Sequence, residues 1–275
     1  FCYNISIALQ YYFFLTCSGW GMWHDEIHLD ELGQFPIPSW LGKEDNEYIE
    51  KLALLMDEIN EYEDITLFTP IKNNQRSIKE LKGDIDEIVF DLYRLTKNER
   101  DLVKDMCSYG LDLFYKKSDS YAMGKLPDIA DGFYGVETDL HEKNHLIYKY
   151  IQKIVSSING YLAEFDAELE WRLYRSKGVI AVLFLSKYKS ELVGEDYKDD
   201  NEWETALSKF EELSQQKVTD NIYIEGSFVG VSETCIVVIK KDEQRNWTAS
   251  MAWDDLNSIL LKIANQRLLE VDANE

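Results

Sequence analysis

Two histidines near the start of the chain have the spacing that most resembles a reactive site. His24 and His28 are four residues apart with two acids between them, in the sequence HDEIH. The HExxH zinc motif requires Glu after the first histidine, and Asp25 stands there instead. Ile27 and Leu29 alternate with polar residues as in a strand, which would separate the two rings by about 13 Å. A metal site, a contact with bases or phosphates and an ordinary polar surface all remain open for this pair.

Three tryptophans surround the same segment. Trp20, Trp23 and Trp40 lie close together in the sequence. Aromatic rings can stack on nucleic-acid bases, and rings at this density can also fill a hydrophobic core. We take Trp20, Trp23, His24 and His28 as candidate DNA contacts, and a core role for the tryptophans is the alternative.

No group of residues has the pattern of a catalytic site. Pro127-Asp128 and Asp196-Tyr197-Lys198 are similar to the two halves of a PD…(D/E)xK nuclease motif, but they are far apart in the sequence. Asp196 is also predicted to lie in an acidic, solvated loop. The chain has neither a GxxxxGK[ST] phosphate loop nor a Ser/His/Asp grouping with supporting context. We therefore predict no catalytic residue, no metal and no cofactor in this chain.

The cysteines and the apolar N-terminal segment indicate the cellular compartment. The four cysteines are widely spaced and form no CxxC pair: Cys2, Cys17, Cys107 and Cys235. This usage argues against zinc and against a disulfide framework, and it suits a reducing cytoplasm. Residues 5–15 are apolar but too short to span a bilayer, and no basic residue precedes them as in a signal peptide. We expect a cytoplasmic protein that does not engage a membrane. The first residue is Phe1 rather than Met, which predicts a missing upstream part.

Composition and charge limit the function classes. Of the 275 residues, 45 % are hydrophobic and 13 % aromatic, which is enough for a folded core. The formal net charge is −22, and every region of the chain carries more acids than bases. The sequence therefore shows no basic stripe that could follow a phosphate backbone. Any contact with nucleic acid must be local, or a partner must supply positive charge.

Two stretches with coiled-coil spacing are expected to position the other elements. Their apolar residues recur at alternating steps of three and four, the spacing of helices that pack along a seam. The seam residues are Tyr48, Leu52, Leu55, Ile59 and Tyr62 in the first stretch, and Ile78, Leu81, Ile85, Ile88, Leu92 and Leu95 in the second. Pro70 and a turn signal at residues 72–74 separate the stretches, which predicts an antiparallel helical hairpin. The alternative is that both stretches face one globular core.

A fixed corner is expected after the second stretch. The Thr96 hydroxyl can accept the backbone N–H of Glu99, and the Glu99 carboxylate can reach back to Thr96, which together form a capping box. Helices are predicted over 97–117 and 138–160. The Gly- and Pro-bearing residues 118–137 between them predict a linker loop.

The rest of the chain alternates strands and helices. Strands are predicted at 168–175 and 179–188, a helix at 205–213, a second strand pair at 220–226 and 233–241, and a closing helix at 251–271. The predicted fold class is α+β: a helical spacer with an antiparallel helix hairpin, followed by a small α+β domain with an antiparallel sheet.

Three segments resemble parts of adenine-specific DNA methyltransferases of restriction-modification or phage-defence systems. Residues 3–40, with SGW, a short strand and FPIPSW, are similar to the end of their target-recognition domain. Residues 85–96 with Glu99 are similar to the pattern ID-x-x-V-x-x-LYgLT-x-x-E that ends their spacer, with Arg94 where Gly is frequent. Residues 236–255 are similar to their IYIIKP…RRYWT…DADE tail, with Lys241 in place of Pro.

The resemblance implies a division of the chain and a role. Residues 1–42 would end a target-recognition domain, 43–117 would be a helical spacer, 118–137 a linker loop, and 138–275 a helix plus a small α+β domain. The parent enzyme would use S-adenosylmethionine and flip adenine out of the duplex. The polar-Pro-Pro-aromatic and FxGxG-like sequences that such catalysis needs do not occur here. The catalytic domain would therefore lie upstream or on another chain.

On this reading the chain acts on DNA only through its parent protein or complex, by holding recognition elements at a set distance from the catalytic domain or subunit. The alternative comes from the net charge of −22. It is an acidic, non-catalytic interaction subunit, or a DNA mimic, that binds a basic partner.

Overall fold

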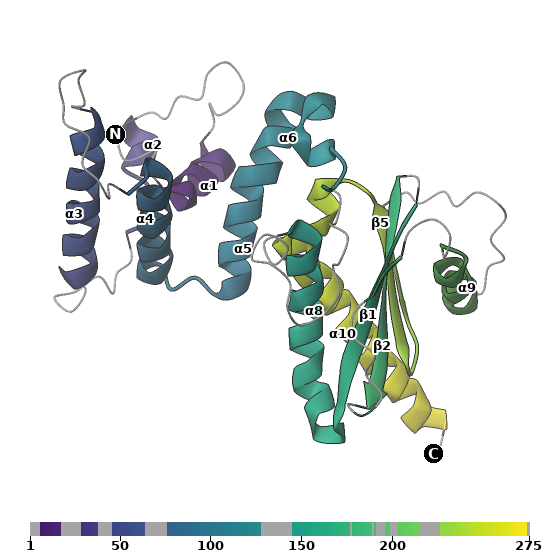
Figure 1. Ribbon diagram of the computed structural model, residues 1–275. Coiled ribbons are helices and arrows are strands. Elements are labelled where there is room, and N and C mark those ends of the chain that lie inside the picture. Colours follow the sequence, from purple (N-terminus) through teal and green to yellow (C-terminus); the bar gives the residue numbers. More distant parts are fainter. Residues whose placement is uncertain are drawn as a thin grey trace. The chain divides into compact units, whose positions relative to one another are not determined.

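The computed structural model describes residues 6–17, 29–37, 46–63, 76–127, 145–176, 178–188, 190, 196–198, 203–214 and 226–273. The fold is α+β, as the sequence predicts. The chain divides into two units, Phe1–Leu111 and Asp112–Glu275 (Figure 1). None of the described helices is both long enough and apolar enough to cross a bilayer.

The first unit is helical. Its elements are α1 (Ile7–Thr16), α2 (Leu29–Leu32), α3 (Asn46–Glu63), α4 (Ile78–Leu92), α5 (Lys97–Asp105) and the π-helix η3 (Met106–Gly110). Because α1 packs against α4, α5 and η3, it belongs to the same body as the spacer helices. The division after Leu111 does not coincide with the boundaries predicted after residues 42 and 117.

Helices α3 and α4 form the predicted antiparallel hairpin. Glu58, late in α3, lies 3.9 Å from Arg76, which precedes α4. Lys51, early in α3, lines the same groove as Ile88, late in α4. The side chains between the two helices are Ile59, Leu81, Ile85 and Val89, all buried, with Leu52, Leu55, Met56 and Tyr62 partly buried.

The buried stripe of α4 differs in part from the predicted seam. Leu81 and Ile85 are buried as predicted, but the next buried position on this face is Val89 rather than Ile88, and Ile78 is 41 % exposed. A step of four twice in succession follows the period of a straight helix, about 3.6 residues, rather than the shorter period of a supercoil. The hairpin is too short to impose supercoiling, so α4 packs as an ordinary globular helix.

Another side of α4 holds α1 in place. Asp86 is buried, and its Oδ1 accepts the backbone N–H of Ile7, the first residue of α1, at 2.8 Å. The carboxylate thereby satisfies an N–H group that a helix start leaves without a partner. Burial raises the pKa of Asp86, and its hydrogen bonds with Ile7 and Ser6 oppose that rise.

A wide helical turn follows α5. Met106–Gly110 form the π-helix, after which α6 (Leu111–Lys116) continues the chain. A Cβ at position 110 would lie against the Met106 sulfur, so a larger residue there would require the flexible Met106 side chain to move. The Cys107 thiol donates to the Ile7 carbonyl over 3.3 Å. Burial raises the pKa of Cys107 to about 12, which keeps the thiol neutral.

The second unit surrounds one sheet. Its elements are η4 (Lys117–Asp119), η5 (Tyr121–Met123), α8 (Leu146–Leu162), η7 (Ala163–Phe165), β1 (Ala167–Ser176), β2 (Val179–Tyr188), β3 (Asp196–Lys198), α9 (Trp203–Ser214), β4 (Ser227–Val231), β5 (Cys235–Lys241), η10 (Gln244–Trp247) and α10 (Ala249–Ala273).

The strands lie in the order β3-β1-β2-β5-β4. The pairs β1–β2, β2–β5 and β4–β5 are antiparallel, as predicted, and β3 adds in parallel to β1. Residues 196–198 thus form a short edge strand where the sequence predicts a loop. The partner of β5 is Ser227–Val231, directly after the predicted strand 220–226, of which residues 220–225 lie outside the described part of the chain.

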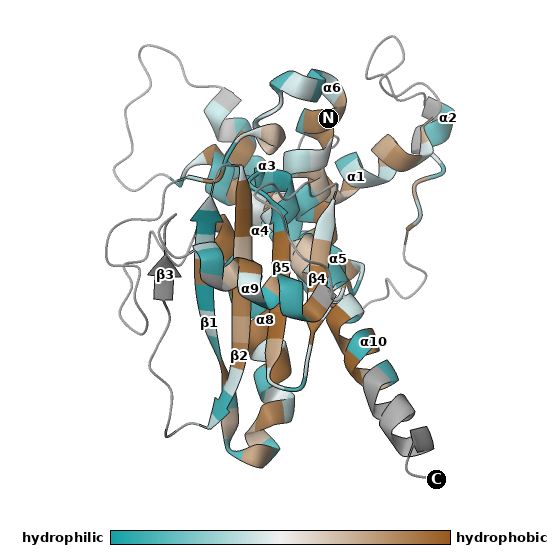
Figure 2. Ribbon diagram, turned by 90° about the vertical axis from the view of Figure 1, so that its right-hand side faces the viewer, coloured by the Kyte–Doolittle hydropathy of each residue, from teal (hydrophilic) through white to brown (hydrophobic). Residues whose placement is uncertain are grey.

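Helices cover both faces of this sheet. In Figure 2, α9 crosses in front of the apolar central strands and α8 lies behind them. Strand alternation sends Trp171, Val182 and Val238 toward α8 and α10, and Leu183 and Val237 toward α9. A Cβ at Gly230 would lie 3.0 Å from Leu213 of α9, so glycine lets that helix approach the sheet closely.

The first part of the predicted linker is bound to the sheet. Asp242 Oδ1 accepts the backbone N–H of Leu126 at 3.0 Å, and Arg175 donates to the Leu126 carbonyl at 2.6 Å. Arg175 and Asp242 also pair, at 2.9 Å. Residues 120–127 are thus held against the sheet of the second unit by hydrogen bonds. Residues 128–137 of the predicted linker lie outside the described residues.

Strand β4 is outermost among the described strands, and it has a side-chain contact on the side away from β5. Ser232 donates its backbone N–H to the Cys235 carbonyl at 2.8 Å, which closes the β4–β5 hairpin and sets its hydrogen-bonding register. In that register the backbone of Val229 points away from β5. Lys262 of α10 donates from its ammonium group to the Val229 carbonyl.

Candidate functional site

The four candidate DNA contacts lie outside the described residues. The structure therefore places neither Trp20 and Trp23 nor His24 and His28. The predicted spacer positions are all described. Ile59, Leu81 and Ile85 are buried, Tyr48, Leu52, Leu55, Ile88, Leu92 and Leu95 are partly buried, and Ile78 is exposed.

The corner between α4 and α5 has the predicted capping box. Thr96 Oγ1 accepts the N–H of Glu99 at 3.4 Å, and Glu99 Oε2 accepts the N–H of Thr96 at 2.7 Å. Its backbone and side-chain hydrogen bonds to Thr96 lower the pKa of Glu99. Ser77 and Glu80 form the same arrangement at the start of α4. Both α4 and α5 therefore begin at a capping box that is set by local chemistry.

The turn that forms the corner contains a strained residue. Arg94 has a φ of 53°, in the left-handed region. This conformation costs a residue with a side chain about 1–2 kcal/mol, and glycine adopts it freely. The Arg94 and Leu95 N–H groups bond to the Asp91 and Phe90 carbonyls, at 2.9 Å each, and close the end of α4.

The FPIP segment packs against this corner. The Tyr93 hydroxyl donates to the Pro36 carbonyl at 2.8 Å, and the Phe35 and Tyr93 rings lie 5.7 Å apart. Phe35 also meets Tyr12 of α1 edge to face, at 5.0 Å. These rings, with Leu102 of α5, line an apolar groove of about 350 Å³. Two segments far apart in the sequence thus form one aromatic cluster.

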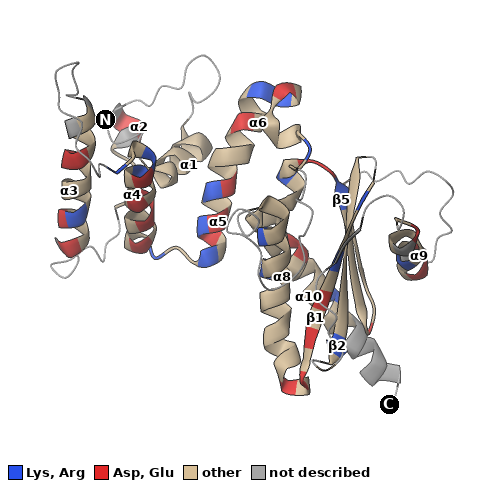
Figure 3. Cartoon of the chain, viewed as in Figure 1, with Lys and Arg blue, Asp and Glu red and all other residues tan. Residues whose placement is uncertain are grey.

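Basic side chains near the corner form ion pairs with acidic side chains. Arg100 lies 2.6 Å from Asp91 and 3.1 Å from Glu87, and Lys104 lies 2.6 Å from Glu87. Figure 3 shows mainly acidic residues along α4 and acidic and basic residues interleaved along α5. The described part of this unit therefore presents mixed charge at the corner rather than the basic stripe that binds phosphates.

A buried charged network joins β5, η10 and α10 in the second unit. Lys240 is 1 % exposed and pairs with Asp255, which also accepts the Tyr150 hydroxyl. Lys240 donates to the Asn246 carbonyl at 3.1 Å, and its ammonium lies 5.7 Å from the Trp247 ring. Burial lowers the pKa of Lys240, against the pull of Asp255. Burial raises the pKa of Tyr150. Because these groups are sealed from solvent, we assign the network a structural role.

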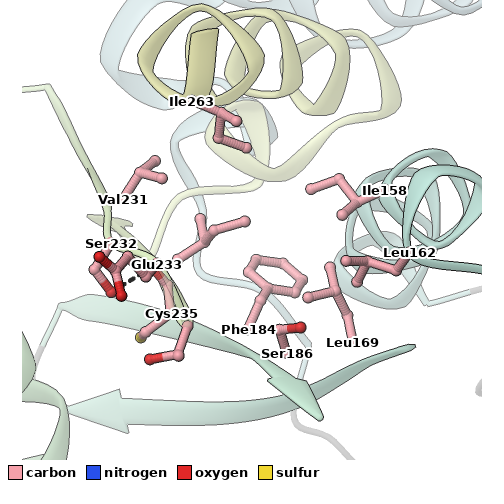
Figure 4. Close-up of a pocket in the computed structure, with 12 residues that line it drawn as sticks. Ile158, Leu162, Leu169, Phe184, Ser186, Val231, Ser232, Glu233, Cys235 and Ile263 are labelled. Atoms are coloured by element: carbon pink, nitrogen blue, oxygen red, sulfur yellow. Dashed lines mark hydrogen bonds between the residues drawn. The ribbon is translucent and has the colours of Figure 1, made fainter. Parts of the chain in front are cut away.

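A cavity of about 280 Å³ opens at one end of the second unit (Figure 4). Apolar side chains form most of its lining: Ile158 and Leu162 of α8, Leu169, Phe184, Val231 and Ile236 of the sheet, and Ile263 of α10. Residues from β2, the β4–β5 turn and the start of β5 also line it: Ser186, Ser232, Glu233, Thr234 and Cys235. The cavity is apolar at its base and polar on one side.

The described lining of this cavity suits the binding of a small molecule. The described lining residues supply hydroxyl groups and one carboxylate, and they include no His, Lys or Arg that could activate a nucleophile. The Cys235 side chain belongs to the cluster on the opposite face of the sheet. Burial raises the pKa of Cys235 to about 11, so the thiol is neutral. Among the described residues, no group of three or more His, Cys, Asp or Glu could hold a metal ion.

Sequence reasoning missed the Asp86 cap, the Lys240 network and the cavity. Asp86 lies between the apolar positions Ile85 and Ile88, and an acid on an apolar face could have indicated a buried partner. Lys240 likewise ends the apolar run IVVIK. The cavity depends on how two helices lie over a sheet, and no local pattern encodes it.

Comparisons of the chain with protein-family models, with curated proteins and with solved structures found no match in any of the three.

Proposed function

We propose that this chain is the C-terminal recognition and spacer part of an N6-adenine DNA methyltransferase of restriction-modification or phage-defence type. It would position DNA recognition elements relative to a catalytic domain that this chain does not contain. The observation that carries the proposal is the cluster at the α4–α5 corner, where two of the three resembling segments meet through Tyr93 and Pro36.

The backbone at Arg94 supports the same proposal. The resembling family frequently has Gly at this position, and here Arg94 adopts the left-handed conformation that favours glycine. Arg94 thus departs from the family pattern in its side chain, whereas its backbone has the conformation that glycine favours. The third resembling segment also has a physical basis, because its Lys240, Trp247 and Asp255 form one buried network.

The proposed role is geometric. Base contacts read sequence, and contacts that fix register and orientation determine where those readers lie. The capped corner at Thr96 fixes the direction of α5 relative to α4, and the Tyr93 bond ties the FPIP segment to it. Phosphate contacts would come mainly from other parts of the parent enzyme, which would use S-adenosylmethionine as the methyl donor.

Mapping of N6-methyladenine in genomic DNA tests the proposal. The chain is expressed with any coding sequence contiguous with it, in a host that lacks adenine methylation. We expect methylation at one recurring sequence. Tyr93→Phe, which removes the bond to Pro36, should lower the methylated fraction at that sequence, whereas Tyr188→Phe, at an exposed tyrosine of β2, should leave it unchanged.

Absence of N6-methyladenine from every sequence context, with the protein shown to be expressed and folded, would overturn the proposal. Methylation that is unchanged in a strain lacking the coding sequence of residues 1–275 would show that this part is dispensable, and would also overturn it.

The net charge of −22 favours a second candidate, an acidic interaction subunit or DNA mimic. A gel-shift series with the isolated chain at increasing salt separates the two. DNA binding that weakens with salt supports recognition. No DNA binding, combined with salt-sensitive capture of a purified basic partner encoded beside it, supports the acidic module.

A further inference from the structure

We propose that the cavity between α8, α10 and the β4–β5 turn binds a small molecule with an apolar body and a positively charged amino group, such as an arylalkylamine. The proposal is independent of the proposed function, because it rests on the second unit alone. It rests on the size of the cavity, its apolar base and the one acidic residue among the described lining residues.

The apolar base sets the size and character of the ligand. Phe184 is fully buried beneath the cavity, and Ile158 and Ile263 enter from two helices (Figure 4). The volume of about 280 Å³ corresponds to about nine groups of the size of a water molecule. An aromatic ring with a short alkyl chain has this size. Desolvation of such a body supplies the favourable binding free energy.

The polar side sets the charge of the ligand. Among the lining residues that the structure describes, Glu233 is the one acidic residue and none is basic. An anionic ligand would therefore meet a carboxylate without a compensating cation. A cationic amino group would instead be attracted to Glu233 and could donate to neighbouring hydroxyl oxygens.

The polar side is held in place before any ligand binds. The Ser232 backbone N–H and hydroxyl both donate to the Cys235 carbonyl, at 2.8 and 3.3 Å. The Ser186 N–H donates to the Thr234 carbonyl at 3.0 Å. The turn that presents Glu233 is thus fixed to both neighbouring strands, which limits the ordering cost of binding. Small-molecule sites commonly combine such an apolar base with a few fixed polar groups.

Calorimetric titration of the full chain with three probes of matched size tests the proposal. The probes are 2-phenylethylamine, 2-phenylethanol and 3-phenylpropionate. We expect one-site binding of the amine with a Kd of about 1 mM or tighter, weaker binding of the alcohol, and the weakest binding of the carboxylate. Equal affinity for the amine and the carboxylate, or no saturable binding of the amine, would overturn the proposal.

Two variants assign the binding to this cavity. Glu233→Gln, at an exposed turn, should weaken amine binding about two- to fivefold, the range of an exposed ion pair, and leave alcohol binding unchanged. Glu204→Gln, at an exposed acid of α9, should change neither. Ile263→Phe should fill the cavity and reduce binding of both probes more than tenfold, with circular dichroism showing a retained fold. Binding that survives Ile263→Phe unchanged would place the ligand elsewhere and overturn the proposal.

Discussion

The two units of this chain are stabilised in different ways. The second unit has a sheet with helices on both faces and most of the large, fully buried side chains among the described residues, including Trp171, Trp247 and Lys240. The described part of the first unit has fewer, and its helices are defined by capping boxes at Ser77 and Thr96 and by exposed ion pairs.

The two units should therefore be destabilised by different kinds of substitution. Helix caps typically contribute about 1 kcal/mol each, and surface ion pairs contribute about 1 kcal/mol or less. Buried networks in a sheet core cost several kcal/mol when one member is removed. A single substitution in the buried network should therefore destabilise the second unit by more than loss of one cap or surface pair destabilises the first unit. Amide hydrogen exchange measured on peptides from each unit can resolve the two separately.

The largest effect is expected from Asp255→Ala. This change leaves the Lys240 ammonium buried without its carboxylate and should destabilise the second unit by about 3–5 kcal/mol. Exchange in β5 and α8 peptides should accelerate, and the first unit should not change. Asp254→Ala, at the exposed neighbour, is the control and should stay within about 0.5 kcal/mol of the native protein. Equal effects of the two variants would contradict a buried pair.

Asp86→Ala should give the largest effect in the first unit. The Ile7 N–H would lose its buried acceptor, at an expected cost of about 1–3 kcal/mol. Exchange in peptides of α1 should report the loss first. Asp86→Asn keeps an acceptor oxygen and should recover most of the stability. If the Asn variant is as unstable as the Ala variant, the charge matters rather than the hydrogen bond.

Arg94→Gly should stabilise the first unit, by up to about 1 kcal/mol, because glycine adopts the left-handed conformation without steric cost. Lys79→Gly, in the exposed first turn of α4, provides the opposite case and should cost up to about 1 kcal/mol. Urea unfolding followed through exchange in α4 and α5 peptides measures both. Destabilisation by Arg94→Gly would show that the arginine side chain contributes more than its backbone costs.

Glu87→Gln should have a smaller effect. Glu87 pairs with both Arg100 and Lys104 but is half exposed, so the loss should be below about 1 kcal/mol. The difference from the native protein should shrink in about 1 M salt, which screens exposed pairs. Glu50→Gln, at an exposed acid of α3, serves as the control. A loss that persists at high salt would indicate a contribution other than charge.

The smallest expected effect is a change in how the free energy of unfolding of the first unit depends on pH. The pKa of Asp86 is raised in the folded state, so the folded chain takes up a proton before the unfolded chain does as the pH falls. This residue should therefore add stability to the first unit as the pH falls through its folded pKa, and Asp86→Asn should remove that gain. Parallel pH profiles of native protein and variant would contradict the raised pKa.

The sequence predicted the features that depend on neighbouring residues. The Thr96–Glu99 cap, the helical hairpin and the β1–β2 turn at Gly178, which has a φ of 79°, all follow from short-range chemistry. Features that depend on distant residues were missed. Asp86 binds Ile7 across 79 positions, and Tyr150 binds Asp255 across 105.

The candidate sites also combine locally encoded segments with contacts between distant residues that the sequence does not specify. The resemblance indicated the segments around Pro36 and Tyr93, but their contact was visible only in the structure. The cavity at Phe184 depends on the separation of α8 and α10, which no residue spacing specifies. The three-residue strand β3 was missed because its pairing with β1 is fixed by tertiary context rather than by an apolar pattern.

The contact between Lys262 and the Val229 carbonyl has a consequence for self-association. An outermost strand with free backbone groups invites another chain to extend the sheet, which is a common route to aggregation. Here an ammonium group already occupies a carbonyl that points away from β5. A strand from another molecule would have to displace the Lys262 ammonium group to pair with Val229. The lysine therefore disfavours extension of the sheet at β4.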